Sequence, residues 1–172
     1  LGAAQISRYL IISSFETWQA VSNWYIALAK DQWVADAEIR KVVAELTKDL
    51  SDEMEIIKAI HEFVVKSTRY VALEFGIHGH KPYPAPLVLK RRFGDCKDKA
   101  SLLKVMLAVA GIRADFVLIR TRPNGAISTT IPTPYLFDHA IVYLPKYKLF
   151  LDGTAETSGI NELPFQDQGA IA

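Results

Sequence analysis

The hydrophobic pattern of this chain changes its period once, and that change limits the folds that the chain can adopt. Up to Gly111 most apolar residues recur every three or four positions, as they do in amphipathic helices. Beyond that glycine they gather in short segments typical of strands, namely RADFVLIRTR, DHAIVYL and KYKLFLD. Helices first and strands later predict an α+β domain, with a helical layer on an antiparallel sheet.

The predicted helices cover residues 13–31, 35–50, 51–71 and 96–110. The first begins with a possible capping box from Ser13 to Glu16. His61 lies off the apolar stripe that we assign to the third helix, so we expect it to be solvated. The fourth helix ends at Gly111, in the usual position of a C-terminal cap. Among the strands, residues 113–122 are apolar on both faces, which is typical of a central strand.

The only cysteine, Cys96, lies where a loop becomes the fourth helix. Gly94 and Asp95 precede it, and Asp95 is suited to cap the helix. The free N–H groups and the positive dipole end of a first turn favour an anion such as a thiolate. A buried structural cysteine is the common alternative, but the flanking GDCKDK is polar and charged. We interpret Cys96 as a reactive thiol, and the surrounding lysines and arginines as mostly solvated.

Length and composition exclude several classes of protein. The chain has 172 residues, enough for one domain with a full core, and half of them are hydrophobic. A net charge of +1 gives no reason to expect a nucleic-acid partner. No apolar run approaches the roughly 20 residues of a membrane span. One cysteine excludes an internal disulfide. Because the chain starts at Leu1, we expect residues 1–172 to be a single domain of a longer protein.

Residues 76–86, GIHGHKPYPAP, break the helical pattern just upstream of Cys96. We interpret them as a long loop of the kind that shapes a binding cleft. His78 and His80 are a weak metal motif, because no acidic or thiol partner accompanies them. We therefore expect neither a metal nor another cofactor.

The last two strands supply a possible base and a possible orienting carboxylate for the thiol. If the turn is residues 144–147, His139 pairs directly with Asp152, and their Cβ atoms lie about 4.5–5.5 Å apart. A turn longer by two residues leaves the pair diagonal on one face, whereas one extra residue separates them onto opposite faces. Asp138 points to the other face, and Glu156 lies beyond the strand. Either His139 or Asp152 alone would be unremarkable, but with Cys96 they make a nucleophile, a base and an orienter.

At this point the sequence resembles the bacterial branch of the transglutaminase-like superfamily. The matching motifs are GDCKDKASLL, DHAIVYL and LDGTAE, with EFGIHGHKPYPAPLVLKRRF upstream. The resemblance runs from about Trp18 to Glu156, and Gly153 departs from it because many relatives have proline there. It implies a papain-like α+β fold with the catalytic triad Cys96, His139 and Asp152. It also implies a larger parent protein with neighbouring domains and a periplasmic or cell-envelope location.

The expected chemistry is acyl transfer from a peptide or carboxamide carbonyl through a thioester on Cys96. Transfer to water makes a cysteine peptidase or amidase, and transfer to an amine makes a transglutaminase. We prefer hydrolysis, because water needs no second binding site. The Cys96 N–H would bind the oxyanion, and Tyr70 and Tyr83 are candidates for a second donor. Two other classes stay open: a non-catalytic interaction module of an envelope protein, and a redox sensor that needs neither His139 nor Asp152.

Overall fold

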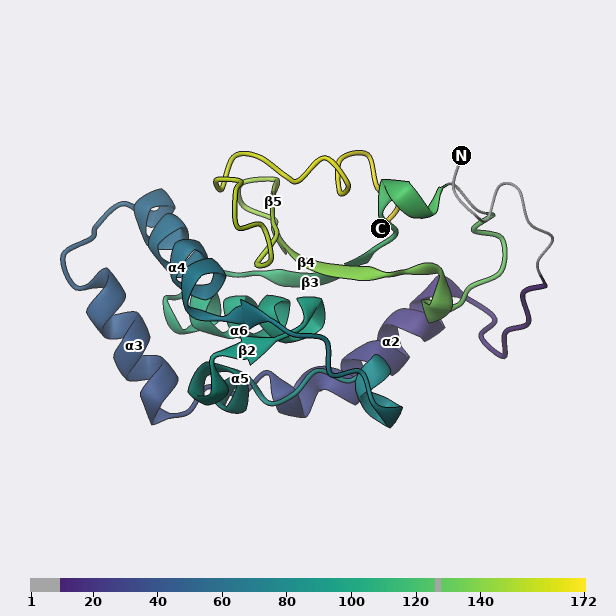
Figure 1. The fold of residues 1–172 in the computed structure, drawn as a ribbon, viewed down its shortest axis with the longest axis horizontal. Coiled ribbons are helices and arrows are strands. Elements are labelled where there is room, and N and C mark those ends of the chain that lie inside the picture. Colours follow the sequence, from purple (N-terminus) through teal and green to yellow (C-terminus); the bar gives the residue numbers. More distant parts are fainter. Residues whose placement is uncertain (1–9, 126–127) are drawn as a thin grey trace.

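The computed structural model describes residues 10–125 and 128–172, which form five α-helices and five strands. The helices are α2 (Trp18–Ala29), α3 (Ala37–Thr47), α4 (Glu53–Ser67), α5 (Ala85–Arg91) and α6 (Cys96–Val109). The strands are β1 (Arg69–Tyr70), β2 (Phe93–Gly94), β3 (Asp115–Ile119), β4 (His139–Leu144) and β5 (Leu149–Leu151). Helices precede the main sheet along the chain and pack against one of its faces (Figure 1). The predicted α+β class is confirmed.

Helix α6 is the centre of the fold, with α4 and α5 against its sides and strand β4 across it. From its first residue to Leu107, every side chain except that of Lys104 is buried. Even Lys99 is buried, because its ammonium group donates to the backbone carbonyls of Val65 and Thr68. The expectation that the lysines beside Cys96 are solvated is therefore wrong. Their long side chains bind fixed acceptors inside the domain.

The main sheet has the antiparallel order β3-β4-β5, so β4 is its central strand. The prediction of a central strand at residues 113–122 is wrong, because β3 pairs with β4 alone within the described ranges. The register places Phe116 opposite Val142 on the core-facing side of β3, where aromatic side chains cover it. Phe116 stacks on Tyr25 of α2 at 5.3 Å between ring centroids and lies 5.4 Å from the Trp33 ring. Helix α2 thus supplies part of the wall beside the sheet.

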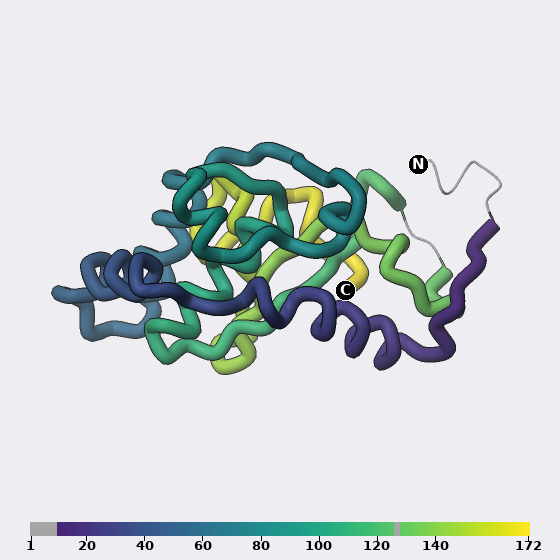
Figure 2. The backbone as a smooth tube through the Cα atoms, turned by 90° about the horizontal axis from the view of Figure 1, so that it is seen from below, coloured from purple at the N-terminus to yellow at the C-terminus, as the bar shows by residue number. Residues whose placement is uncertain are grey.

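The first helix begins later than the capping box predicts. Its N-cap is Thr17, whose hydroxyl accepts the N–H of Ala20. The Ser13 hydroxyl instead donates to the carbonyl of Pro132. Residues 10–17 consequently run beside the segment around Pro132 before α2 starts, as both backbone views show (Figures 1 and 2). The Ser13 side chain thus makes a tertiary contact with Pro132 instead of capping the helix.

The loop upstream of Cys96 is shorter than predicted, because α5 occupies its end. Pro84 is the N-cap residue, and Pro86 lies in the first turn, where a missing N–H breaks no hydrogen bond within the helix. The helix ends at Arg91, and the capping residue Arg92 has a left-handed φ of 59°. The chain then forms β2, which pairs in parallel with β1 so that Tyr70 lies opposite Gly94. This pairing brings Tyr70 close to the start of α6.

No helix within the described ranges combines the length and the apolar character that crossing a membrane requires.

Candidate active site

Cys96 is the first residue of α6, and its position is fixed by the residues on either side. The Asp95 carboxylate accepts the Asp98 N–H at 3.2 Å, and the Asp98 carboxylate accepts the Asp95 N–H at 3.3 Å. The two form a capping box around the cysteine. Gly94 must lack a side chain, because a Cβ there would lie 2.6 Å from the Asp98 Cβ. The GDCKD motif is thus a fixed helix start, and the Cys96 side chain that it positions is only 9 % exposed, where it lines a cleft.

The charged neighbours of Cys96 serve this helix start. Lys97 forms an ion pair with Asp95, and both side chains are buried. Arg91 binds Asp98 at 2.6 Å, and the Tyr83 N–H donates to the same carboxylate at 2.8 Å. These contacts neutralise the two capping aspartates. Arg91, Lys97 and Lys99 are therefore engaged with protein acceptors, whereas Arg92 is exposed as expected.

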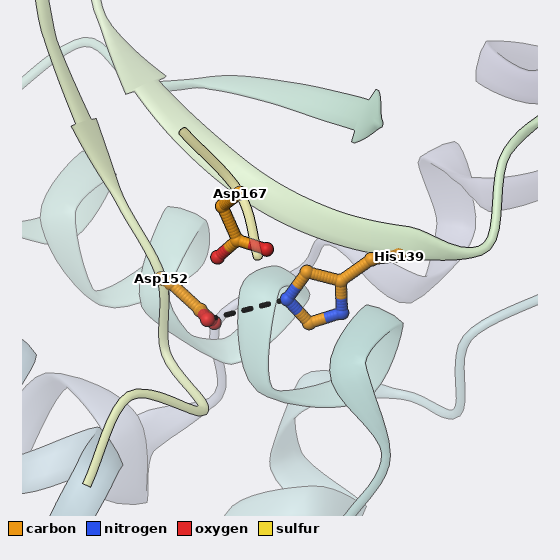
Figure 3. A group of neighbouring side chains, drawn as sticks. All are labelled: His139, Asp152 and Asp167. Carbon is orange, nitrogen blue, oxygen red and sulfur yellow. Dashed lines mark ion pairs between the residues drawn. The ribbon is translucent and has the colours of Figure 1, made fainter. Parts of the chain in front are cut away.

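His139 opens β4, and Asp152 directly follows β5, which puts both at the same end of the hairpin. Val142 pairs with Leu151 and Leu144 with Leu149, so the loop between the strands has two more residues than the predicted direct pairing requires. The direct pairing of His139 with Asp152 is wrong. The diagonal alternative describes the structure, and the imidazole Nε2 lies 3.2 Å from Asp152 Oδ2 (Figure 3).

Asp152 is held as an anion by several donors. Thr154 donates to its Oδ1 through the backbone N–H at 2.7 Å and through the hydroxyl at 2.8 Å. Burial alone would raise the pKa of Asp152, but the contacts with His139 and Thr154 outweigh it and lower that pKa. The carboxylate therefore stays charged beside the imidazole.

The imidazole of His139 lies between Asp152 and Cys96. Burial alone would lower the pKa of His139, but hydrogen bonding to Asp152 and to the Cys96 side chain outweighs it and raises the pKa to about 10. An imidazole in this setting keeps its proton at neutral pH whenever the thiol is ionised. The structure thus brings together the three side chains that the sequence singles out.

His61 of α4 is a residue of this site whose environment was misjudged from the sequence. It is 2 % exposed, not solvated, and its Nε2 lies 2.8 Å from the backbone carbonyl of Asp152. Burial lowers the pKa of His61, so the neutral ring donates its N–H to that carbonyl. The signal was available, because Ile57, Ile60, His61, Val64 and Val65 follow the spacing of one buried helix face.

The other acidic candidates lie apart from the imidazole. The Asp138 carboxylate accepts the Thr121 N–H at 2.8 Å and also binds the Thr121 hydroxyl and Asn124. It fixes the end of β3, as its predicted position on the opposite face allows. Glu156 is exposed.

The two loop histidines are held by aromatic rings. His78 stacks on Tyr83 with 3.8 Å between ring centroids, and its Nδ1 donates to the Lys81 carbonyl at 3.0 Å. His80 packs edge-on against Trp24 and Tyr135. Neither belongs to the group of described residues whose spacing suits a metal, which is His139, Asp152 and Asp167.

The spacing of that group is not enough to assign a metal site. Its ligand atoms all lie within 4.8 Å of one another. However, Asp152 already accepts two hydrogen bonds from Thr154 and faces the imidazole directly. We do not assign the three residues as metal ligands.

A cleft of about 170 Å³ lies over the thiol and the imidazole. It is lined by Cys96, Lys97, His139, Tyr25, His80 and Tyr135, among others. A wider groove of about 590 Å³ follows α2 and β3 and shares Tyr25, Leu118 and Phe137 with the cleft. The two hollows therefore adjoin, and α2 forms a wall of both.

Comparison with known proteins supports the fold. No curated protein matches the chain. A solved structure from Parabacteroides distasonis, titled as a candidate protease, is 18% identical over 90% of this chain and 29% of its own, with a TM-score of 0.67. Another from Cytophaga hutchinsonii, titled as a candidate cysteine protease, is 14% identical over 72% of this chain and 40% of its own, with a TM-score of 0.52.

The chain thus spans well under half the length of either solved relative. At such low identity the structural likeness establishes the fold alone. The family follows from the sequence profile described as the transglutaminase-like superfamily, which matches residues 40–148, more than half of the chain. This protein belongs to the transglutaminase-like superfamily.

Proposed function

We propose that this domain is a thiol-dependent acyl-transfer enzyme that hydrolyses peptide or carboxamide bonds through Cys96, His139 and Asp152. The observation that carries the proposal is the placement of His139, whose imidazole lines the same cleft as Cys96 and whose Nε2 lies 3.2 Å from a buried carboxylate. Membership of the superfamily and the protease titles of the solved relatives support the same class of activity.

In the first half-reaction, His139 takes the proton of the Cys96 thiol, and the sulfur attacks the substrate carbonyl carbon. The C–S bond forms as the carbonyl π electrons move to oxygen. When the tetrahedral intermediate collapses, the C–N bond breaks and the imidazolium gives its proton to the leaving amine. Asp152 stabilises the imidazolium throughout these steps and fixes which ring nitrogen faces the thiol.

The second half-reaction returns the enzyme to its starting state. His139 takes a proton from water, and the water oxygen attacks the thioester carbonyl. The C–S bond then breaks, the carboxylic acid leaves, and the proton returns to the sulfur. No redox partner or cofactor is needed for the atoms and electrons to balance.

Tyr25 is the best-placed second donor for the oxyanion. It lines the same cleft as Cys96 and His139, and its side chain is fixed by stacking on Phe116. Its buried hydroxyl has no hydrogen-bond partner among the residues that the structure describes. Burial, and then the nearby Cys96, raise the pKa of Tyr25, so the hydroxyl keeps its proton and remains a donor.

The two tyrosines considered from the sequence are less suited to this role. Tyr83 stacks on His78 and lies under the Arg91 guanidinium, away from the cleft lining. Tyr70 is 46% exposed and is not among the residues that line the cleft. The Cys96 backbone N–H and the Tyr25 hydroxyl would together make an oxyanion hole.

Replacing Tyr25 with phenylalanine should separate activity from stability. Loss of one oxyanion donor is expected to lower kcat by about 10²-fold while KM stays nearly constant. The melting temperature should stay equal or rise, because the hydroxyl that is removed is buried and unpartnered within the described residues. Steady-state kinetics and thermal unfolding measure the two effects. Tyr135→Phe, on the exposed rim of the same cleft, is the matched control. An unchanged kcat in Tyr25→Phe would remove Tyr25 from the mechanism.

The acceptor of the acyl group is tested by running the reaction in heavy-oxygen water with an excess of a labelled primary amine. We expect the new carboxyl group to gain one heavy oxygen and the amine to remain free, because water needs no second binding site. Mass spectrometry of the products reads both outcomes. Amide formation exceeding acid formation would make the domain a transglutaminase that uses the same three residues.

A further inference from the structure

The last part of the chain is tied across the main sheet and carries an acidic side chain to the site. We call residues 164–171 the C-terminal strap. Arg122 donates its N–H to the Gln166 carbonyl and Arg120 donates to that of Ile171, both at 2.8 Å. The Arg122 guanidinium also lies 4.3 Å from the Phe165 ring centroid. These contacts hold the strap beside β3 and β4 (Figure 1).

Asp167 is the residue of the strap that points inward. Turn hydrogen bonds join Asp167 to Pro164 and Ala170, and its neighbours Gln166 and Gln168 are exposed. Asp167 itself is 3 % exposed. Figure 3 shows its carboxyl group directed at the space between Asp152 and His139. The strap thus places a second carboxyl group beside the proposed orienting carboxylate.

Within the part of the chain that the structure describes, the Asp167 carboxyl group lacks a protein donor. Neither of its buried oxygens has a hydrogen-bond partner among the described residues. Asp152, by contrast, accepts two hydrogen bonds from Thr154 and faces His139. Two buried carboxylates this close repel each other unless one holds a proton. Since Asp152 has the donors that stabilise an anion, the proton belongs on Asp167.

We propose that Asp167 is a positioning residue of the site: its carboxyl group, carried in by the C-terminal strap, shares a proton with Asp152 and so sets the negative charge that His139 meets. The inference rests on the proposed function only for its consequence in catalysis. The contact itself is a property of the fold and is measurable without a substrate.

The charged groups that face Asp167 determine when it loses its proton. Burial, and then the charge of Asp152, raise the pKa of Asp167 to about 6, while the His139 imidazolium opposes this shift and Asp138 adds to it. Below that pH the protonated Asp167 donates a hydrogen bond to the Asp152 carboxylate, which reduces the negative charge that Asp152 presents to the imidazole. Above it, a second carboxylate faces His139. Coupling between two sites is reciprocal, so ionised Asp167 must favour the protonated imidazole.

The test is an NMR titration of the imidazole nitrogens of His139 in the wild-type protein and in two variants. Asp167→Asn keeps the shape and a donor but cannot ionise. Glu162→Gln removes an equal charge from an exposed position just before the strap and is the matched control. In the wild type and in Glu162→Gln, we expect the His139 nitrogen signals to show two transitions. A small inflection near pH 6 reports the ionisation of Asp167, and the main transition near pH 10 is the loss of the imidazole proton.

In Asp167→Asn the inflection should vanish, and the main transition should fall by about one pH unit, the effect of losing one charge within about 6 Å. The alkaline limb of any hydrolytic activity should fall with it. A packing role alone would change the melting temperature and leave the titration of His139 where it was. Identical titrations in all three proteins would overturn the proposal.

If Asp167→Asn does not fold, the carboxyl carbon of Asp167 is titrated in the wild type. A transition near pH 6 that is mirrored at Asp152 supports the shared proton, and a transition near the ordinary aspartate value of about 3.9 overturns it. Failure of the proposed function has a different signature. In that case no peptide is hydrolysed, yet the titration of His139 still depends on Asp167.

Discussion

Cys96→Ala is expected to abolish hydrolysis, with a fall in kcat/KM of about 10⁴-fold or more, because no other group at the site can form the thioester. The fold should persist. The capping bonds of α6 come from Asp95 and Asp98, and alanine is a good helix former. Peptide cleavage followed by mass spectrometry, with a thermal melt on the same samples, measures both outcomes.

A result against this expectation would be informative. Cleavage by Cys96→Ala at more than a few per cent of the wild-type rate would place the nucleophile elsewhere or trace the activity to a contaminant. Loss of cleavage together with loss of the folded state would instead say nothing about chemistry. Cys96→Ser then serves as the second variant, because it keeps a small polar side chain at the same helix start.

His139→Ala is expected to lower kcat/KM by about 10³- to 10⁴-fold, since both half-reactions use the imidazole to move a proton. Asp152→Asn should approach the same loss, because an amide can neither balance the imidazolium charge nor hold the required ring nitrogen in place. The same peptide assay measures all of these rates.

The structure offers a matched control for Asp152→Asn in Asp138→Asn. Asp138 is adjacent to His139 in the sequence, but its carboxylate binds Thr121 and Asn124. The control should therefore lower the melting temperature and leave kcat nearly unchanged. Equal losses of kcat in both variants would mean that the sheet edge, rather than the orienting carboxylate, governs activity.

The hairpin illustrates how far the sequence could define the site. The alternation of side chains in strands required His139 and Asp152 to share a face for any loop of even length. Which residues of β4 and β5 pair with each other depended on the length of the loop between the two strands. Residues 145–148 form the loop, and Lys148 adopts a left-handed φ of 51°, which a non-glycine residue seldom does. The local sequence does not predict a left-handed backbone conformation at Lys148.

Burial of polar side chains was harder to predict than the helices that carry them. Lys97, Lys99 and His61 look solvated when each is judged by residue type. Each is buried because its side chain donates to a specific acceptor. Lys97 binds the Asp95 carboxylate, Lys99 binds carbonyls at the end of α4, and His61 binds the Asp152 carbonyl. Such acceptors come from segments distant in the sequence, so a local pattern cannot reveal them. For His61 the helical spacing gave a signal that its residue type obscured.

Tyr25 and Asp167 show the same limit at the site itself. The segment that forms α2 was predicted to be helical, but which of its side chains would line the cleft depended on how the helix packs beside β3. Asp167 lies in a segment of turns without periodicity, and only the tertiary contacts of the strap direct it inward. A papain-like arrangement was predictable from the motifs around Cys96, His139 and Asp152. Groups that adjust those three residues were not.

The most direct test of the account is the rate at which iodoacetamide alkylates Cys96 between about pH 5 and pH 10, in the wild type and in His139→Ala. Because the pKa of His139 is raised to about 10, its imidazolium is present over nearly all of this pH range and can pair with a thiolate. We therefore predict rapid, stoichiometric labelling of the wild type at pH 6. His139→Ala should react at least about 10-fold more slowly there and recover only as the pH approaches about 8.5, the value for a simple thiol. Coincident curves for the two proteins would contradict the account, because His139 would then not serve this thiol and the domain would be better explained as an interaction module.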